Sequence, residues 1–430
     1  MTLAIPAILM MVLFALNTPI AFAIGISALS FFFLADGVPF PIFVQKMVSA
    51  TESYPLLAVP FFVLTGGIMN ASGITRRLLA FTDALVGHMT GALAQACTVL
   101  ATLLGGLTAS SSADAAMLAK TLGPEMVSRG YSAAFAAAIT SSAAIITAMI
   151  PPGIGLIIYG YLADVSVGRL FIGGVVPGLM ISAALMLLTH WIARRRGYVA
   201  LRERFVGWRA VASTGREAMW ALMIPIFIVV GLRYGFFTPT EAGAIAVLVT
   251  LAIGTLAYGE LRLDQAGTVL REAVIDTSTV MLLVCAASAF GFYLAWERLP
   301  PQLANWLVTL TDNRWMLLLL INVLLIVLGT AVEGTAALII LTPIFAPVAA
   351  KFGIDPVHFG VVLVMNLTIA GITPPVGQMM FISCAVMRVP MEVYTIEIMP
   401  FLGAMFVVLF AITFYPPLVT ALPDFLMGAG

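Results

Sequence analysis

Long apolar runs recur along the whole chain, and they limit its possible folds more than any other feature. A helix of about 20 apolar residues crosses the hydrocarbon core of a bilayer, which is about 30 Å thick. Hydrophobic residues make up 62% of the chain and charged residues only 9%, whereas soluble domains carry about 25% charged residues. We therefore expect an all-α polytopic protein of the inner, cytoplasmic-type membrane.

The first apolar stretch begins at Leu3 and lacks the basic segment that opens a secretory signal. We expect it to remain as an uncleaved first span. Predicted full-length spans lie near residues 3–34, 54–74, 131–165, 170–193, 219–235, 240–258, 275–296, 356–388 and 396–420.

Two further apolar stretches, near residues 90–125 and 315–350, are interrupted halfway by small and polar residues. The breaks are Gly105–Asp114 and Gly329–Thr335. Each half has about 16 residues and reaches only about 24 Å at 1.5 Å per residue. That length is short of the hydrocarbon core. Re-entrant hairpins are therefore favoured over the alternative, two ordinary spans joined by a turn.

The connection between Arg194 and Arg216 is the most arginine-rich segment of the chain, and the positive-inside rule places it in the cytoplasm. Counting spans from there puts Arg76 and Arg77 on the same side. The first hairpin then enters from the cytoplasm and the second from the opposite face. The N-terminus is expected in the cytoplasm and the C-terminus in the periplasm.

The two halves of the chain resemble each other at one fixed offset, which carries Pro151-Pro152 onto Pro374-Pro375. At the same offset Gly106 falls on Gly329, Pro124 on Pro347, Gly130 on Gly353 and Pro177 on Pro400. Each half has a hairpin, a span broken by Pro-Pro and a span that begins near a proline. One extra span between them makes the repeats inverted, an arrangement typical of secondary transporters.

Two adjacent prolines at mid-membrane stop or unwind a helix, because each removes a hydrogen bond and clashes with the preceding turn. The carbonyls freed in Ile146–Ile150 and Ala370–Thr373 are oxygen ligands suited to a small cation such as sodium. Nearby side chains could complete the shell: Ser141, Ser142, Thr147, Thr368, Thr373 and Asn366. The alternative is that Pro-Pro merely kinks two helices, which then repack.

The second half of each hairpin begins with helix-capping residues, Ser110–Ser112 in the first and Gly334-Thr335 in the second. A helix N-terminus offers free N–H groups and partial positive charge, so it favours anions. Neither tip carries lysine or arginine, so amides, hydroxyls, bound cations or an arginine from elsewhere would hold an anionic solute. The alternative role for the serines is helix packing.

Asp114 and Glu333 place ionisable groups at the two tips, where such groups are costly and by default functional. Glu333 could ligate a cation, cap the half-helix or carry a proton, whereas the helix dipole alone favours a carboxylate at Asp114. The three cysteines and three histidines are scattered, so they predict neither disulfides nor a metal site. The net charge of zero offers no surface for nucleic acid.

Several segments resemble the large membrane subunit of TRAP transporters, the tripartite ATP-independent periplasmic systems. They are Pro60–Met69 with Ser72–Ile74, Gly105–Asp114, Ile150–Gly153, Phe237–Ala244 and Gly371–Gly377. They cover nearly the whole chain in the expected order. The Thr-Pro-Thr-Glu-Ala segment and the paired Pro-Pro breaks are fairly specific to that family.

The resemblance implies a subunit of the bacterial inner membrane that uses a sodium gradient to import an organic acid. A periplasmic binding protein would deliver the acid, and a separate small four-span membrane subunit would be a further partner. Sodium would be the coupling ion, with no other cofactor. A hairpin-containing transport domain would move against a scaffold by an elevator mechanism.

The resemblance also implies where the ligands bind, with each cation between a hairpin tip and its Pro-Pro break. The first sodium site would comprise Ser110, Ser111, Ser112, Thr147, Ile150 and Pro151. The second would comprise Gly329, Thr330, Glu333, Gly371, Thr373 and Pro374. The substrate would contact Ser111, Ser112, Pro152, Gly153, Gly334, Thr335 and Pro375.

We expect four parts: scaffold spans in 1–88, a first repeat core in 89–193, further scaffold spans in 194–274 and a second repeat core in 275–430. Amphipathic stretches near 76–88 and 260–272 are predicted to be arms that join scaffold and core, unless they are simple cytoplasmic loops.

A stand-alone sodium- or proton-coupled dicarboxylate carrier is the alternative function, because it would share the paired hairpins and inverted repeats. The chain is not expected to be an enzyme: it has no His-Glu-x-x-His motif, and Asp114 and Glu333 would have to approach each other to form a catalytic pair. The repeat with its hairpins also disfavours a channel.

Overall fold

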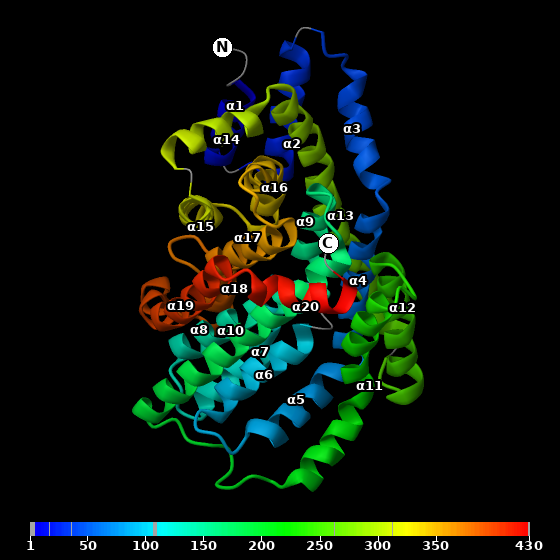
Figure 1. Cartoon of the computed structure of the whole chain (residues 1–430). Coiled ribbons are helices and arrows are strands. Elements are labelled where there is room, and N and C mark those ends of the chain that lie inside the picture. Colours follow the sequence, from blue (N-terminus) through cyan, green and yellow to red (C-terminus); the bar gives the residue numbers. More distant parts are fainter. Residues whose placement is uncertain are drawn as a thin grey trace.

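The computed structural model describes residues 5–16, 18–35, 37–105, 110–261, 263–311 and 313–428. Within these residues every regular element is a helix, which confirms the predicted all-α class. Figure 1 shows an elongated molecule with the N-terminus at one end and the connection between α10 and α11 at the other.

The first half contains ten α-helices and a short 3-10 turn. These are α1 (Ile5–Ala15), α2 (Ile20–Leu34), α3 (Pro41–Thr51), η2 (Tyr54–Leu57), α4 (Ala58–Ala71), α5 (Ile74–Val86), α6 (Ala92–Gly105), α7 (Ser111–Ser128), α8 (Ala133–Met149), α9 (Ile154–Leu162) and α10 (Val167–Arg196).

The second half continues with α11 (Trp208–Arg233), α12 (Pro239–Ala252), η3 (Ile253–Ala257), α13 (Leu263–Trp296), α14 (Leu299–Leu310), α15 (Arg314–Ala331), α16 (Gly334–Lys351), α17 (Pro356–Ala370), α18 (Gln378–Met387), α19 (Met391–Phe414) and α20 (Pro417–Met427).

The inverted repeat is visible in the order of the helices. The hairpin α6–α7, the broken pair α8–α9 and the long α10 correspond to α15–α16, α17–α18 and α19. The offset that carries Pro151 onto Pro374 also carries α5 onto almost the range of α14. Figure 1 shows α5 and α14 at opposite ends of the molecule, so the two units enter from opposite faces as predicted.

The same offset relates the residues that start the helices. Ser132 accepts a hydrogen bond from the Phe135 N–H at the start of α8, and Asp355 accepts one from the His358 N–H at the start of α17. Each side chain satisfies a backbone donor that the first helical turn leaves unpaired. The repeat thus extends to the local chemistry that sets each helix start.

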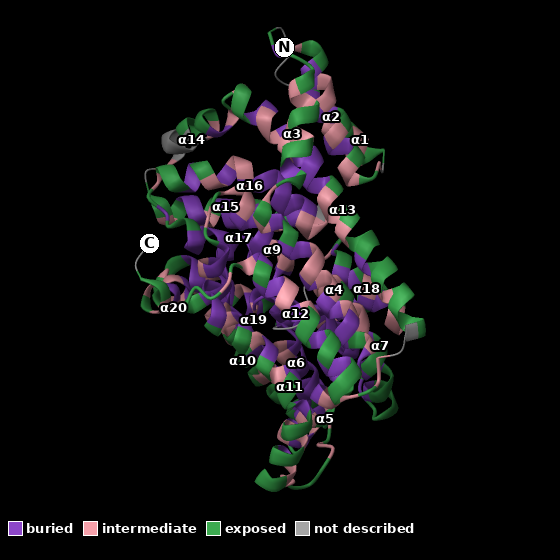
Figure 2. Cartoon of the chain, turned by 90° about the vertical axis from the view of Figure 1, so that its right-hand side faces the viewer, coloured by how far each residue is buried: buried purple, intermediate pink, exposed green. Residues whose placement is uncertain are grey.

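The helices form two groups. In the scaffold group, α13 packs against α2, α3 and α4, and α4 packs against α12. In the core bundle, α8 packs against α6, α7, α10 and α19, while α17 packs against α15 and α16. Nearly all residues of α8 and α17 are buried, as expected for helices that are hydrophobic on all sides. Figure 2 shows this buried interior between more exposed outer helices.

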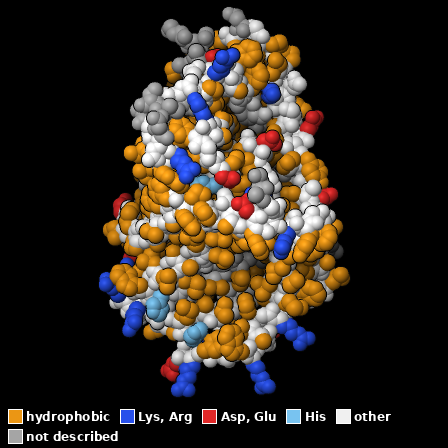
Figure 3. Space-filling view, viewed as in Figure 1, with side chains coloured by type: hydrophobic (Ala, Val, Ile, Leu, Met, Phe, Trp, Pro, Cys, Tyr) orange, Lys and Arg blue, Asp and Glu red, His pale blue; other side chains and the backbone are white. Residues whose placement is uncertain are grey.

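Seven helices in the described residues are long and apolar enough to cross a membrane, or eight if α8 and α9, bent by 45°, count as one span. Large apolar side chains are exposed on these helices, such as Leu187, Ile226 and Val407. Figure 3 shows apolar side chains over much of the visible face. The protein is therefore a multi-pass membrane protein.

Two expectations from the sequence are wrong. The predicted first span over 3–34 is two helices, α1 and α2, which pack against each other. The predicted arm at 260–272 is not a separate helix, because α13 runs unbroken over Leu263–Trp296. The amphipathic helix that corresponds to α5 is α14. The predicted domain boundary at residue 274 consequently falls inside α13.

Candidate functional site

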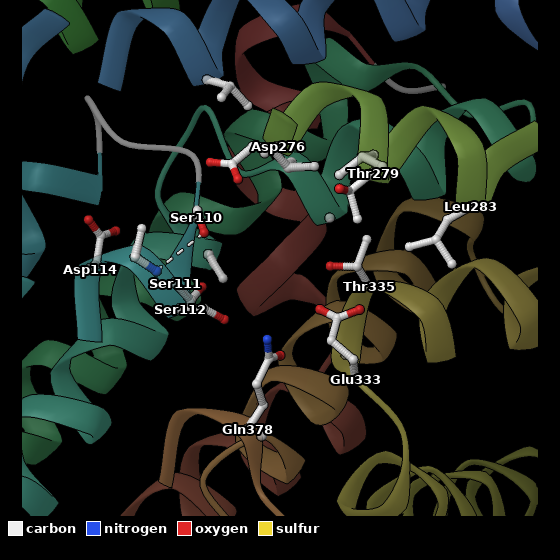
Figure 4. A pocket seen from close by; sticks show the side chains of 18 of the residues that line it. Ser110, Ser111, Ser112, Asp114, Asp276, Thr279, Leu283, Glu333, Thr335 and Gln378 are labelled. Carbon is white, nitrogen blue, oxygen red and sulfur yellow. Dashed lines mark hydrogen bonds between the residues drawn. The ribbon is translucent and has the colours of Figure 1, made fainter. Parts of the chain in front are cut away.

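A cavity of about 860 Å³ lies where the two hairpin tips meet the scaffold. Residues 110–114 of the first tip and 333–335 of the second line it together with parts of α4, α13, α17 and α18. Figure 4 shows side chains from both tips facing this space. Two segments from different halves of the chain thus line one cavity.

The first tip is the N-terminus of α7. Ser110 has an extended backbone, and its side chain accepts a hydrogen bond from the Ala113 N–H at 3.3 Å. Ser111 and Ser112 follow in the first turn and line the cavity. Asp114 also belongs to the lining but is only 2% exposed. The remaining part of the predicted break, residues 106–109, lies outside the described residues.

The second tip repeats this geometry with a carboxylate in place of a hydroxyl. Glu333 falls on Ser110 at the repeat offset and caps α16, accepting a hydrogen bond from the Ala336 N–H at 2.9 Å. Gly334 and Thr335 line the cavity next to it. Of the three roles considered for Glu333, the structure shows the capping role directly.

Each hairpin packs against the break of its own repeat. A Cβ on Gly105, the last residue of α6, would lie 2.9 Å from the Ile150 Cβ and 3.3 Å from the Thr147 Cα. A Cβ on Gly329, in α15, would lie 2.6 Å from the Ala370 Cβ. Such close approach requires glycine. The two halves therefore place each hairpin beside a Pro-Pro segment, as expected.

The Pro-Pro segments are real breaks. Pro151-Pro152 and Pro374-Pro375 have cis peptide bonds, and they separate α8 from α9 and α17 from α18. These prolines and Gly153 do not line the cavity, whereas Gly371 does.

The carbonyls near the breaks are less free than the sequence suggested. The Ile146 carbonyl accepts from the Ile150 N–H at 3.0 Å, and the Ala370 carbonyl accepts from the Thr373 N–H at 3.0 Å. The Gly371 carbonyl accepts from the Met379 N–H at 2.8 Å. The prediction that all carbonyls of these segments are free is therefore wrong. The Gly371 carbonyl also accepts from the Met380 N–H at 3.4 Å, so both of its lone pairs are used. The Ile146 and Ala370 oxygens each keep a second lone pair for a cation.

Several predicted hydroxyl ligands bond to backbone behind the cavity. The Thr147, Thr330 and Thr373 hydroxyls donate to carbonyls of their own segments, at 2.8 to 2.9 Å. None of the three, nor Gly329 or Ile150, lines the cavity. Thr368 does line it, although its hydroxyl donates to the Val364 carbonyl at 2.7 Å.

Two further polar side chains serve packing. The Ser141 and Tyr394 hydroxyls are 2.8 Å apart between α8 and α19. The Asn366 amide donates to the Asn322 side chain at 2.7 Å between α17 and α15. These buried hydrogen bonds fix helices of the core bundle against each other.

The scaffold contributes a polar wall that the sequence analysis missed. Glu272, Asp276 and Thr279 line the cavity from one face of α13, at the three- and four-residue spacing that aligns side chains on a helix. Gln378, from the start of α18, is a further lining residue. Figure 4 shows Asp276 and Thr279 on one side of the cavity and Glu333 and Gln378 on another.

The signal for this wall was present in the sequence. Two carboxylates one turn apart, at the start of an apolar run, mark a functional candidate in a membrane protein. The expected boundary separates them, because Glu272 ends the predicted arm at 260–272 and Asp276 belongs to the predicted span at 275–296.

The cavity has a clear chemical character. No lysine or arginine is among the described residues that line it, and the described residues hold no cluster of three or more His, Cys, Asp or Glu suited to a metal ion. Helix N-termini, hydroxyls, side-chain amides and carboxylates are therefore the polar groups available to a ligand there.

Comparison with known proteins gives a consistent picture. The family described as "Tripartite ATP-independent periplasmic transporter, DctM component" matches residues 7–418. The chain is 38% identical over 417 residues to the sialic acid TRAP transporter large permease protein SiaM of Vibrio cholerae, with 96% of each chain covered. It is 37% identical over 381 residues to the C4-dicarboxylate TRAP transporter large permease protein DctM of Pseudomonas aeruginosa, with 89% of each covered.

The fold also has a solved counterpart. The crystal structure of the Alcanivorax borkumensis YdaH transporter matches with a TM-score of 0.67, covering 96% of this chain and 99% of that chain. The sequence identity is 17%, so the match shows a shared fold.

Proposed function

The chain belongs to the DctM family of large permease components of tripartite ATP-independent periplasmic transporters, and from this premise we propose that it imports an organic acid by coupling to sodium. The meeting of two capped helix N-termini in one cavity carries the proposal. Helix N-termini favour a carboxylate, and the carboxylate of Glu333 beside them favours a cation.

The two cations are proposed to lie between each tip and its break. In the first repeat, Gly105 brings the end of α6 onto Thr147 and Ile150. In the second, a Cβ on Gly334 would lie 3.5 Å from the Leu367 carbonyl oxygen. Backbone oxygens beside discontinuous helices are the usual sodium ligands in such transporters, so the close seating of each hairpin supports this placement.

The proposed movement is an elevator displacement of the core bundle against the scaffold. The division into two packed groups, with the cavity between them, supports it. The amphipathic arms α5 and α14 each precede a hairpin, so they are placed to join the moving and static parts.

The proposed partners are a small membrane subunit and a periplasmic binding protein, because the family is tripartite. We place the protein in the bacterial inner membrane with the arginine-rich end in the cytoplasm. We propose a periplasmic side for the start of α1, because Figure 1 shows α1 toward the end opposite the α10–α11 connection. The sequence analysis predicts the cytoplasmic side from a single first span, so the two proposals differ. The periplasmic C-terminus remains a prediction.

The purified chain with its small partner should melt at a higher temperature in sodium than in equimolar potassium. A cation at one hundred times its dissociation constant stabilises the folded state by about 2.7 kcal/mol. In vesicles with the binding protein, uptake of the acid should require an inward sodium gradient. Equal melting in both salts, with uptake driven by a proton gradient, would overturn sodium coupling.

A further inference from the structure

We propose that the cavity binds a hydroxylated monocarboxylate, and that Asp276 and Glu272 of α13 select this class of acid. The two carboxylates accept hydrogen bonds from the hydroxyl groups of the ligand and repel a second carboxylate. This inference rests on the proposed function, because it names the kind of organic acid that the same site carries.

The carboxylate of the ligand lies at the N-terminus of α7. There the Ser110 side chain already satisfies the Ala113 N–H, and the Ser110 carbonyl accepts from the Asp114 N–H. Within the described residues, the N–H groups and hydroxyls of Ser111 and Ser112 have no such acceptor. These donors, with the positive end of the helix dipole, suit one carboxylate.

The tip of α16 is less suited to the same group. Glu333 caps this helix with its own carboxylate, and its Oε2 accepts from the Ala336 N–H. A ligand carboxylate there would meet the charge of the N-cap itself, whereas the Asp114 carboxylate in the first turn of α7 is only 2% exposed, so the two tips are not equivalent. The α7 tip therefore takes the charged end of the ligand, and the rest of the ligand extends across the cavity.

The α13 wall of the cavity accepts hydrogen bonds. Asp276 and Glu272 form no ion pair with any described residue, and no described lining residue is basic. A ligand hydroxyl can donate to either carboxylate. A second ligand carboxylate has nothing to donate and faces an uncompensated charge. Repulsion of about 1.4 kcal/mol between like charges in a partly water-filled site weakens binding by about tenfold.

The size of the cavity agrees with a ligand of several hydroxylated carbons. Its volume of about 860 Å³ is in the range of about 300–1,000 Å³ typical of sites for drug-sized ligands. Gln378 and Thr335 line the same space and offer both donors and acceptors to hydroxyl groups.

Four six-carbon acids distinguish the effect of the ligand hydroxyl groups from the effect of a second carboxylate. Gluconate has one carboxylate and hydroxyls, glucarate has two carboxylates and hydroxyls, hexanoate has one carboxylate alone and adipate has two. Binding to the purified chain with its small partner is measured in saturating sodium by the rise in melting temperature over a concentration series. We expect gluconate to bind at least about tenfold tighter than each of the others, a difference of about 1.4 kcal/mol.

Substitutions then assign the selection to α13. Asp276→Asn keeps an acceptor oxygen and removes the charge, so it should strengthen glucarate binding by about tenfold and leave gluconate binding nearly unchanged. Glu272→Gln should act in the same direction. Glu203→Gln changes an exposed residue outside the cavity lining. It should alter the binding of neither gluconate nor glucarate. Melting without ligand confirms that each variant is folded.

The results distinguish a failure of this inference from a failure of the proposed function. Glucarate or adipate binding as tightly as gluconate, or a gluconate-to-glucarate ratio unchanged in both α13 variants, overturns the inference but leaves a sodium-dependent acid carrier. Binding of none of the four acids, in sodium or potassium, counts against the proposed function and removes the inference with it.

Discussion

The contact between Gly329 and α17 decides whether the second hairpin is seated on its break as the structure shows. In Gly329→Ala the added Cβ would lie 2.6 Å from the Ala370 Cβ and 3.1 Å from the Leu367 Cδ2. Carbon atoms in contact are normally about 3.5–4.0 Å apart. The end of α15 must therefore move by about 1 Å, and the hairpin tip with it.

The energetic consequence follows from two opposing effects. Overpacking of this kind costs about 1–3 kcal/mol, whereas alanine in place of glycine favours a helix by about 1 kcal/mol. Gly403→Ala in α19 is the matched control, because nothing lies within 4 Å of its added Cβ. The free energy of unfolding should therefore differ between the two variants by about 1–3 kcal/mol, with Gly329→Ala the less stable.

Melting in sodium and in potassium measures both stability and cation binding. Gly329→Ala should lose much of the sodium-dependent rise in melting temperature, because the hairpin tip no longer packs against the Pro-Pro break. Adding Ala370→Gly removes the clashing atom, so the double variant should recover the sodium response even though glycine lowers the stability of α17. Identical behaviour of Gly329→Ala and Gly403→Ala in both salts would refute the seating of the hairpin.

Three further substitutions test other contacts. Glu333→Ala should lower stability by about 1 kcal/mol through the lost cap and abolish the second cation site. Glu333→Gln should keep the cap but still lose part of the sodium-dependent rise in melting temperature. Glu260→Gln removes ion pairs of 2.6 and 2.8 Å to the two arginines of α5. Because these groups are partly exposed, the free energy of unfolding should fall by less than about 1 kcal/mol, but proteolysis of α5 should be faster. Unchanged proteolysis would contradict this anchoring. Arg169→Gln removes the ion pair to Asp424 that holds α20 against α10, and limited proteolysis should then trim the C-terminal helix sooner than in the wild type.

The hairpins and breaks could be predicted from sequence because they rest on local chemistry that occurs twice. A glycine-rich interruption, a capping residue and a Pro-Pro pair each act on the chain around them, and the constant offset between the two halves exposes the pattern. The N-caps Ser110 and Glu333 are an example, since their equivalence can be read from the amino-acid sequence alone.

The wrong predictions concern helix boundaries, because a run of apolar residues does not show where one helix ends and the next begins. The segment before Ile20 contains the turn signal Asn17-Thr18-Pro19, but apolar residues on both sides made it resemble one span. Asn17 itself lies outside the described residues. At α13 the polar start resembled a separate arm, although the helix continues to Trp296. Only tertiary packing shows that its carboxylates face the two tips.

The composition of α13 changes along its length, and under the proposed elevator movement this change would bias the equilibrium between positions of the core bundle. Its first half presents Glu272 and Asp276 to the cavity, whereas farther along Ala286, Ala287 and Ala289 are small, apolar and buried. A ligand that donates to the carboxylates is stabilised only in the position shown, and a ligand shifts a two-state population only by its differential affinity. Hydroxylated cargo should therefore hold the bundle at this end of its travel longer than bare sodium does.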